Sequence, residues 1–277
     1  MMRGSRACAV AVRAPDQSIV VDVRPLGRAY RGRWARLPFV RGLFILWDSL
    51  VLGMRAMTFS ANVQLGEGEQ IDSKAMTLTL LASIGIALGL FLLLPTAAGE
   101  LIERSLGWSA WWGNLLEGLI RLVLVIAYIA VVGRLPDVRR VFAYHGAEHK
   151  TINAFEAGSE LVEDRIAAFP REHARCGTAF LLTVVVFSVV LFSLLGPLAL
   201  LPRLISRVLL VPILAGVAYE YIRLTGRFSA APWMKPLLAP NLAMQALTTR
   251  EPDQGMIEVA LAAFRAMQRQ EAAAESG

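Results

Sequence analysis

The stretch AMTLTLLASIGIALGLFLLLPTAAG, residues 75 to 99, contains no charged residue. About 20 consecutive apolar residues are enough for an α-helix to cross the hydrocarbon core of a lipid bilayer. A second stretch, Cys176 to Pro202, is also uncharged and exceeds that length. Because helices buried in soluble proteins rarely need uncharged runs this long, both stretches predict membrane-spanning helices.

Two further stretches are apolar but carry a few charges. Residues 111–133 include Glu117 and Arg121, and residues 204–222 include Arg207 and Glu220. Together with the uncharged stretches, they predict a mainly α-helical, polytopic membrane protein with about four spans. We expect these spans at residues 75–99, 111–133, 177–201 and 204–222.

The composition agrees with this class of protein. Of 277 residues, 56% are hydrophobic and 18% charged, and the mean hydropathy is +0.52. A soluble domain usually carries about 25% charged residues. The apolar content excludes a disordered chain. The two distant cysteines, Cys8 and Cys176, exclude a disulfide-rich secreted scaffold.

The basic residues indicate an orientation. Of the 28 Lys and Arg residues, 24 lie in residues 1–74, 134–175 and 223–277, and three lie in the other connections. Since basic residues favour the cytoplasmic side of a membrane, we expect both termini and the central loop in the cytoplasm. The net charge of +6 is then a topological signal, and no nucleic acid is expected as a partner.

Residues 37–57 are apolar, but Arg41, Asp48 and Arg55 recur every seven residues. On a helix these three share one narrow polar stripe, which is typical of a helix lying in the membrane interface. A spanning helix here would move the eight basic residues before it to the outside, against the charge rule. We therefore favour an interfacial or re-entrant helix.

The remaining segments are expected at the cytoplasmic face. In residues 1–36, RACAVAVR and SIVVDVR predict two strands around a turn at Pro15 to Gln17. The basic run Arg24 to Arg36 is expected to meet anionic lipid headgroups. In the tail, residues 223–277, two short amphipathic helices are expected at 237–247 and 256–268.

All three histidines, His145, His149 and His173, lie within 29 residues. Residues 138–157 have helical character, and Gly158 is a plausible stop. On this helix His145 and His149 stand one turn apart on the same face, with Glu148 and Glu156 within about 60° of it. The pattern HxxEH is the inverse of the zinc-peptidase signature, in which two histidines bind metal and the glutamate activates water.

A second pair of metal-binding residue types follows in PREHARCG, residues 170 to 177. Pro170 suits the first turn of a helix that continues into the third span, and on it His173 and Cys176 share a face. Imidazole and thiolate both suit zinc, and other divalent transition metals are possible. The expected ligands are His145, His149, His173 and Cys176.

Several roles stay open for these side chains. Four protein ligands would make the zinc structural, in a non-enzymatic membrane scaffold. An open position would allow a metal-dependent hydrolase with Glu148 as general base. Glu156 and Glu220 are accessory candidates as ligands or orienting carboxylates. A solvated helix face without metal is the alternative, and metal identity, substrate and oligomeric state (a homo-oligomer included) are not determined.

Charges inside the spans suggest another option. Glu117 and Arg121 are four residues apart on one helix and can pair with each other. A charge within a bilayer usually faces a polar interior. The pair is therefore either a structural ion pair or part of a transport path.

The motifs YHGAEHKTINAFEAG, REHARCGTAFLL and AGVAYEYIRLTGR resemble those of the YqhQ-like bacterial membrane proteins (domain of unknown function 1385). LTTREPD, MIEVA, LPFVRG and the opening MMRG are also similar, so the likeness covers most of the chain. The resemblance implies a bacterial inner-membrane protein and a predicted metal-dependent enzyme. His145, Glu148, His149, His173 and Cys176 match its motif positions. The family's glycine-rich segment before MMRG is missing, so a shortened or misassigned start is expected.

Overall fold

The computed structural model describes residues 1–26, 37–65, 73–196, 198–229 and 231–276. The basic segment expected to meet lipid headgroups falls mostly at residues 27–36, which lie outside the described residues. The strands are β1 (Met2–Arg3), β2 (Ala7–Arg13) and β3 (Ile19–Pro25). The helices are α1 (Val40–Leu65), α2 (Ser73–Leu88), a π-helical turn (Gly89–Leu93), α3 (Leu94–Leu106), α4 (Ala110–Val132), α5 (Pro136–Glu156), α6 (Glu163–Ala167), α7 (Ala179–Leu194), α8 (Leu200–Leu209), α9 (Val211–Arg227), a 3-10 turn (Pro232–Met234), α10 (Lys235–Thr248) and α11 (Gln254–Ser276).

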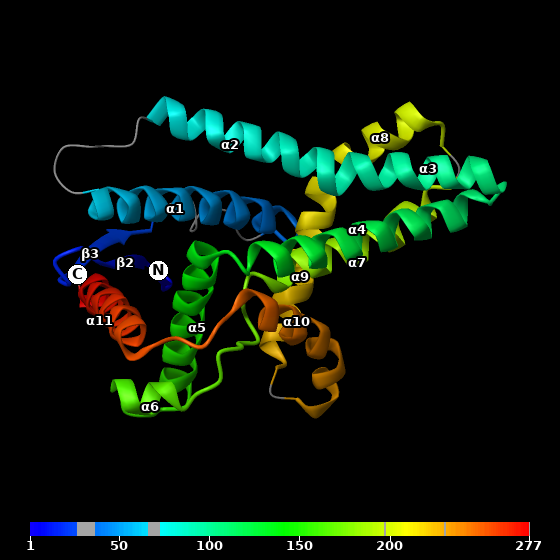
Figure 1. The fold of residues 1–277 in the computed structure, drawn as a ribbon. Helices are drawn as coiled ribbons and strands as arrows, with labels where there is room; N and C mark the ends of the chain where they lie inside the picture. The colour runs from blue at the N-terminus through cyan, green and yellow to red at the C-terminus, as the bar shows by residue number, and fades with distance from the viewer. Residues whose placement is uncertain (27–36, 66–72, 197, 230, 277) are drawn as a thin grey trace.

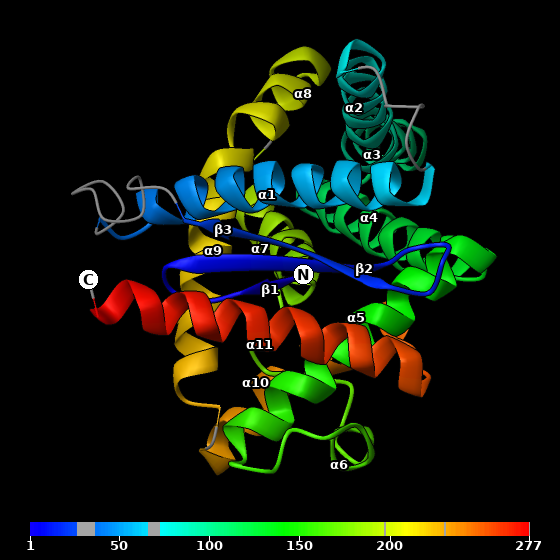
Figure 2. The ribbon, with the colours of Figure 1, turned by 90° about the vertical axis from the view of Figure 1, so that its left-hand side faces the viewer.

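The three strands form one antiparallel sheet in the order β1-β2-β3. The two longer strands confirm the predicted hairpin, in which Asp16 accepts hydrogen bonds from the backbone and side chain of Ser18. Figure 2 shows the sheet lying between α1 on one side and α11 on the other. The predicted tail helices are also confirmed, as α10 and α11.

The core beneath the sheet joins distant parts of the chain. Side chains of β2, α5 and α11 pack into one buried cluster that includes Ala7, Ala147, Ile257 and Phe264. The carboxylate of Glu271, near the end of α11, accepts hydrogen bonds from the backbone N–H groups of Arg6 and Ala7. Sheet, α5 and α11 therefore form one unit, called here the basal domain.

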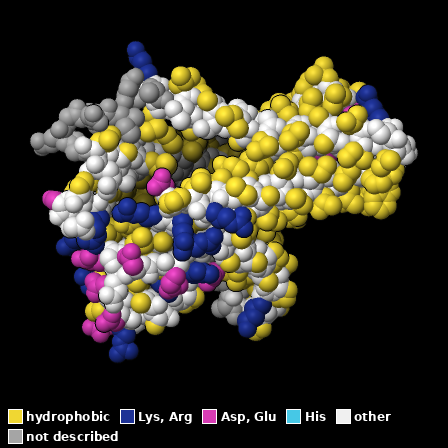
Figure 3. All heavy atoms as spheres, viewed as in Figure 1, with side chains coloured by type: hydrophobic (Ala, Val, Ile, Leu, Met, Phe, Trp, Pro, Cys, Tyr) yellow, Lys and Arg dark blue, Asp and Glu magenta, His cyan; other side chains and the backbone are white. Residues whose placement is uncertain are grey.

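Helices α2, α3, α4, α7 and α8 extend from the basal domain as a helical arm (Figure 1). Most of the arm's visible surface is hydrophobic, whereas acidic and most basic side chains gather over the basal domain and its junction with the arm (Figure 3). Large apolar side chains on the arm are strongly exposed, among them Leu78, Ile86, Leu101 and Leu194. Such a continuous exposed apolar surface suits contact with lipid.

Three helices in the described part of the chain are long and apolar enough to cross a membrane, and a bent pair makes a fourth candidate. They are Val40–Leu65, Met76–Leu106, Ala110–Val132 and the pair Leu200–Leu209 with Val211–Arg227. The segment predicted as interfacial thus forms a helix of spanning length, α1. The segment predicted to span at 177–201 is helical only over Ala179–Leu194, because the chain turns at Gly196, which has a φ of 70°.

The bent pair differs from the single helix expected at 204–222. Helices α8 and α9 meet at Leu210 with a bend of 43°. Pro212 lies in the first turn of α9. Proline lacks the N–H that a continuous helix would use and clashes with the preceding turn, so the helix breaks at this point.

Candidate functional site

Helix α5 presents the two histidines of the HxxEH motif. It begins at Pro136, a residue suited to the first helical turn, and ends before Gly158, which has a φ of 65°. The expected helix is confirmed in type and extent. His145 and His149 lie on the same face, with ring centroids 4.3 Å apart.

Cys176 reaches these histidines from the connection between α6 and α7. The helix expected from Pro170 onward is wrong: α7 begins only at Ala179. Residues 170–178 form turns instead, and the backbone N–H of Cys176 bonds to the carbonyl of His173 at 3.2 Å. The segment is not helical because its backbone groups are bound by side chains of other helices.

Gln245 on α10 is the main anchor of this connection. Its side-chain oxygen accepts from the backbone N–H of His173, and its side-chain nitrogen donates to the carbonyl of the same residue, both at 2.9 Å. Gln245 is fully buried. This two-point hydrogen bond fixes the backbone three residues before Cys176.

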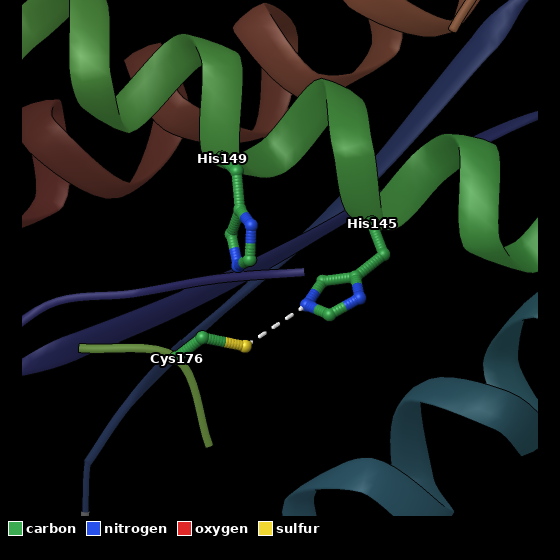
Figure 4. A group of neighbouring side chains, drawn as sticks. All are labelled: His145, His149 and Cys176. Atoms are coloured by element: carbon green, nitrogen blue, oxygen red, sulfur yellow. Dashed lines mark hydrogen bonds between the residues drawn. The ribbon is translucent and has the colours of Figure 1, made fainter. Parts of the chain in front are cut away.

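The side chains of His145, His149 and Cys176 converge (Figure 4). One ligand atom from each residue lies within 4.8 Å of the others, and Sγ of Cys176 is 3.3 Å from Nε2 of His145. His149 and Cys176 are buried, and His145 is partly buried. These three residues are called the His2Cys site below.

Backbone carbonyls fix both imidazole rings from behind. Nδ1 of His145 lies 2.9 Å from the carbonyl of Thr248, and Nδ1 of His149 lies 2.6 Å from that of Arg171. A carbonyl oxygen can only accept, so each Nδ1 carries the proton. In the neutral rings each Nε2 is then left with a lone pair. Metal-binding histidines are held in the same way, by a hydrogen bond from the nitrogen remote from the metal.

The electrostatics of the site favour a thiolate. Burial raises the pKa of the Cys176 thiol, but hydrogen bonds and positive charge from His145 and His149 outweigh burial and lower this pKa to about 5. Burial likewise lowers the pKa of His145, yet contact with Cys176 reverses the direction and raises it. A thiolate with two imidazoles at this distance is a donor set that suits zinc and related transition metals.

The other predicted ligands lie outside the His2Cys site. The ring centroid of His173 is 5.9 Å from that of His149, but both of its nitrogens have other partners. Nδ1 accepts from the backbone N–H of Arg175 at 3.3 Å, and Nε2 lies 3.3 Å from the carboxylate of Glu156. Glu156 therefore contacts His173 through its carboxylate, and its role as an accessory residue of a metal site stays a prediction.

The structure does not bring Glu148 and Glu220 to the His2Cys site. Glu148 faces the N-terminal strands, with its carboxylate 3.5 Å from the amine of Met1 and its charge beside Cys8. Glu220 on α9 binds Arg41 on α1 instead. On α5, one residue separates neighbouring faces by about 100°, which explains why Glu148 points away from the ring of His149.

The sequence pattern gave no indication of Gln245 and Lys150 as supports. Lys150 is buried, and its ammonium donates to the carbonyls of Ala167 and Phe169, both at 2.8 Å, while pairing with Glu251. It thus ties the connection after α6 to α5. Lys150 directly follows HxxEH in the sequence, but its burial and its partners are set by the fold.

Replacing Gln245 with leucine tests the anchor. The substitution leaves the buried N–H and carbonyl of His173 without partners, and we expect it to lower the free energy of unfolding by about 2 kcal/mol. Gln254→Leu is the matched control, because Gln254 makes one exposed hydrogen bond, to Asp164. Denaturant unfolding in detergent measures both variants. Equal stability of the two would contradict the assigned role of Gln245.

The charge pair inside the arm belongs to a larger network. Glu117 is 1% exposed and accepts hydrogen bonds from Arg121, Arg207 and the hydroxyl of Thr96. Arg207 and Arg203 both donate to the side-chain oxygen of Asn114. Arg203 also pairs with Glu100 and Glu103. Three arginines and three glutamates on α3, α4 and α8 thus neutralise one another.

The network also uses a backbone group freed by proline. In a continuous helix the carbonyl of Phe91 would accept from the N–H of residue 95, but Pro95 has none. Arg121 donates to that carbonyl instead, at 2.9 Å, and to the hydroxyl of Ser188 on α7 at 2.8 Å. The predicted Glu117–Arg121 pair therefore connects three helices of the arm.

Comparison with known proteins gives the family. The family described as "Protein of unknown function (DUF1385)" matches residues 37–270, which include the His2Cys site and the arm network. The "Uncharacterized protein YqhQ" of Bacillus subtilis (strain 168) is 30% identical over 292 residues, covering 99% of this chain and 91% of that protein. No solved structure matches the chain. The chain therefore belongs to the DUF1385 family of proteins of unknown function.

Proposed function

We propose that this chain is an integral protein of the bacterial inner membrane that carries a divalent transition metal, zinc in the first instance, at its cytoplasmic face. The long apolar helices support membrane insertion. The concentration of Lys and Arg in residues 1–74, 134–175 and 223–277 supports cytoplasmic termini. The metal would then lie where α5 and the connection before α7 meet the base of the arm.

One observation carries the metal assignment. Two Nε2 atoms and one Sγ converge, while the opposite nitrogen of each ring is already bound to a carbonyl oxygen. A single thiol proton can be donated to only one of the two imidazoles at a time. A cation shared by all three donors satisfies each of them, and its binding displaces the protons that the site otherwise holds.

We further propose that the metal serves hydrolysis. His145, His149 and Cys176 would hold it, leaving a fourth position for water, as in sites with three protein ligands. Zinc in such a position lowers the pKa of bound water to about 7. Because Glu148 faces the strands, the proposal assigns it no proton-transfer role.

A structural metal is the second candidate, because His173 lies close enough to the His2Cys site to be a fourth ligand. Its ring lies 5.9 Å from that of His149, so rotation away from Glu156 could bring it toward the metal as a fourth ligand. A closed sphere of four protein ligands would make this protein a scaffold. The present partners of His173 favour the open site.

Metal analysis of purified protein tests both levels of the proposal. We expect one metal ion per chain in the wild type, its loss in His149→Ala, and its retention in Glu148→Gln, the control from the same helix. His173→Ala separates the candidates: retained metal supports the three-ligand site, and lost metal supports the structural one. A metal-free wild type, or unchanged metal in His149→Ala, would overturn the metal assignment itself.

Cobalt substitution tests the open position without a known substrate. We expect a sulfur-to-cobalt charge-transfer band that disappears in Cys176→Ser. Added azide should change the visible spectrum of the cobalt protein, because an open position accepts an external ligand. A spectrum insensitive to azide would contradict the hydrolase proposal while leaving the metal in place.

A further inference from the structure

An open pocket of about 780 Å³ lies where the start of α1, the end of α9 and the connection before α7 meet. It is distinct from the His2Cys site, and none of its arginines was predicted as a site residue. Four arginines and one carboxylate make the pocket predominantly basic. Its lining residues are Arg41, Arg175, Glu220, Arg223, Leu224, Gly226 and Arg227.

The charges in this pocket do not cancel. Glu220 is paired with Arg41, and Arg175 is paired with Glu156 outside the lining. Among the residues that the structure describes, neither Arg223 nor Arg227 has a carboxylate within the 4.0 Å of an ion pair. Both side chains are exposed. The pocket therefore presents two positive charges that an anion can neutralise.

Arg175 packs against α9 at Gly226. A Cβ atom at Gly226 would lie 2.8 Å from Cγ of Arg175, so the glycine leaves room for this side chain to lie against α9. Arg175 lines the pocket together with Arg223 and Arg227, which lie on the last turns of the helix. Guanidinium groups are well suited to phosphate, which they bind with paired, charge-assisted hydrogen bonds.

Exposed aromatic side chains lie near residues that line the pocket. Phe39, whose backbone N–H donates to Glu220, is 54% exposed, and Trp233 is 63% exposed. The ring of Phe228 lies 6.0 Å from that of Trp233 and 5.6 Å from the guanidinium of Arg227. Tryptophan and arginine gathered at the end of an apolar helix are typical of the headgroup level of a membrane. This setting favours a lipid over a soluble anion.

We propose that the pocket binds the phosphate group of an anionic phospholipid. Arg175, Arg223 and Arg227 hold the phosphate, and the acyl chains lie along the exposed apolar side chains of α9, among them Leu224 and Val217. A zwitterionic lipid brings its own cation to this cluster and is disfavoured. The assignment stands on the pocket alone and does not require the metal.

The pocket also lies next to the His2Cys site along the chain. Arg175 directly precedes Cys176, and its backbone N–H donates to His173. A headgroup bound by Arg175 is therefore held by the same connection that carries the thiolate.

Binding of short-chain lipids to the full chain in detergent tests the proposal. Native mass spectrometry would compare dioctanoyl phosphatidylglycerol, dioctanoyl phosphatidylcholine and inorganic phosphate. We expect the wild type to prefer phosphatidylglycerol over both of the others. Loss of two charge-assisted contacts in Arg223→Gln/Arg227→Gln should weaken its binding at least about tenfold.

The control is Arg269→Gln, which removes an exposed arginine of α11 far along the chain from the pocket and should bind like the wild type. Arg223→Lys/Arg227→Lys keeps the charge and should bind better than the glutamine variant. Thermal unfolding, measured on the same samples, reports folding separately. Unchanged lipid binding in the glutamine variant, equal binding of phosphatidylcholine, or preference for inorganic phosphate would each overturn the proposal.

Discussion

Glu117→Gln is expected to lower the free energy of unfolding by about 3–5 kcal/mol, because removing one partner of a buried ion pair leaves an uncompensated charge. Glu117 accepts from Arg121 and Arg207, which are 4% and 1% exposed. The neutral amide cannot balance the network, whose three arginines would face only two carboxylates. Unfolding of the detergent-solubilised protein by denaturant measures the loss.

Two further variants show whether charge balance is the cause. Arg104→Gln removes a side chain that is 67% exposed and paired with Glu100 on the same helix. An exposed pair contributes about 0–1 kcal/mol, so this variant should resemble the wild type. Adding Arg207→Met to Glu117→Gln removes the unpaired charge and should recover part of the loss. If Glu117→Gln lowers the free energy of unfolding by less than about 1 kcal/mol, charge balance in this network does not stabilise the fold.

Gly146→Ala is expected to lower the free energy of unfolding by about 3 kcal/mol, at the upper end of the range for overpacking. A Cβ atom at this position would lie 2.2 Å from the backbone oxygen of Arg250, a contact that no rotamer change can relieve. The same segment is tied to α5 by the N–H of Arg250, which donates to the carbonyl of Phe142 at 2.9 Å. The segment between α10 and α11 must therefore move as a whole.

This movement should also affect the His2Cys site. The carbonyl that orients His145 belongs to Thr248, two residues before Arg250. If the His2Cys site binds the proposed metal, Gly146→Ala should lower its affinity about 10- to 100-fold, the usual effect of disturbing the partner of a metal-binding histidine. Gly177→Ala, beside Cys176 with nothing within 4 Å of its added carbon, is the matched control. The two variants should differ clearly in thermal unfolding temperature and in metal affinity. Similar values would show that the segment between α10 and α11 can move away from Gly146 without loss of stability.

Local patterns in the sequence predicted the elements well. Alternating apolar residues indicated the strands β2 and β3, and the helical spacing of His145 and His149 indicated their shared face. Both depend on a few neighbouring residues. The charge-free run at residues 75–99 likewise predicted a long apolar helix, found as α2, the π-helical turn and the start of α3.

What the sequence did not reveal depends on distant partners. Pro170 is compatible with a helix start, but Gln245, 72 residues beyond His173, binds the backbone there and holds it in a turn. Glu220 was predicted near the histidines, but no local pattern decides its partner. It binds Arg41, which lies 179 residues earlier in the chain. Arg207 was visible as a charge in a span, but its pairing with Glu117 follows only once α8 packs on α4. Such contacts are set by tertiary structure and not by periodicity.

The joining of the chain's two ends in the basal domain has a consequence for biogenesis. Strands β1 to β3 leave the ribosome first, and α11, which covers their apolar face, leaves last. All the candidate spans are therefore synthesised while the sheet still lacks its cover, a state prone to wrong pairing. Gln245 and Thr248, which position Cys176 and His145, also emerge late. The residues that position His145 and Cys176 are thus made only after helices α2 to α9, and a nascent chain stalled before residue 254 lacks the helix that covers the sheet.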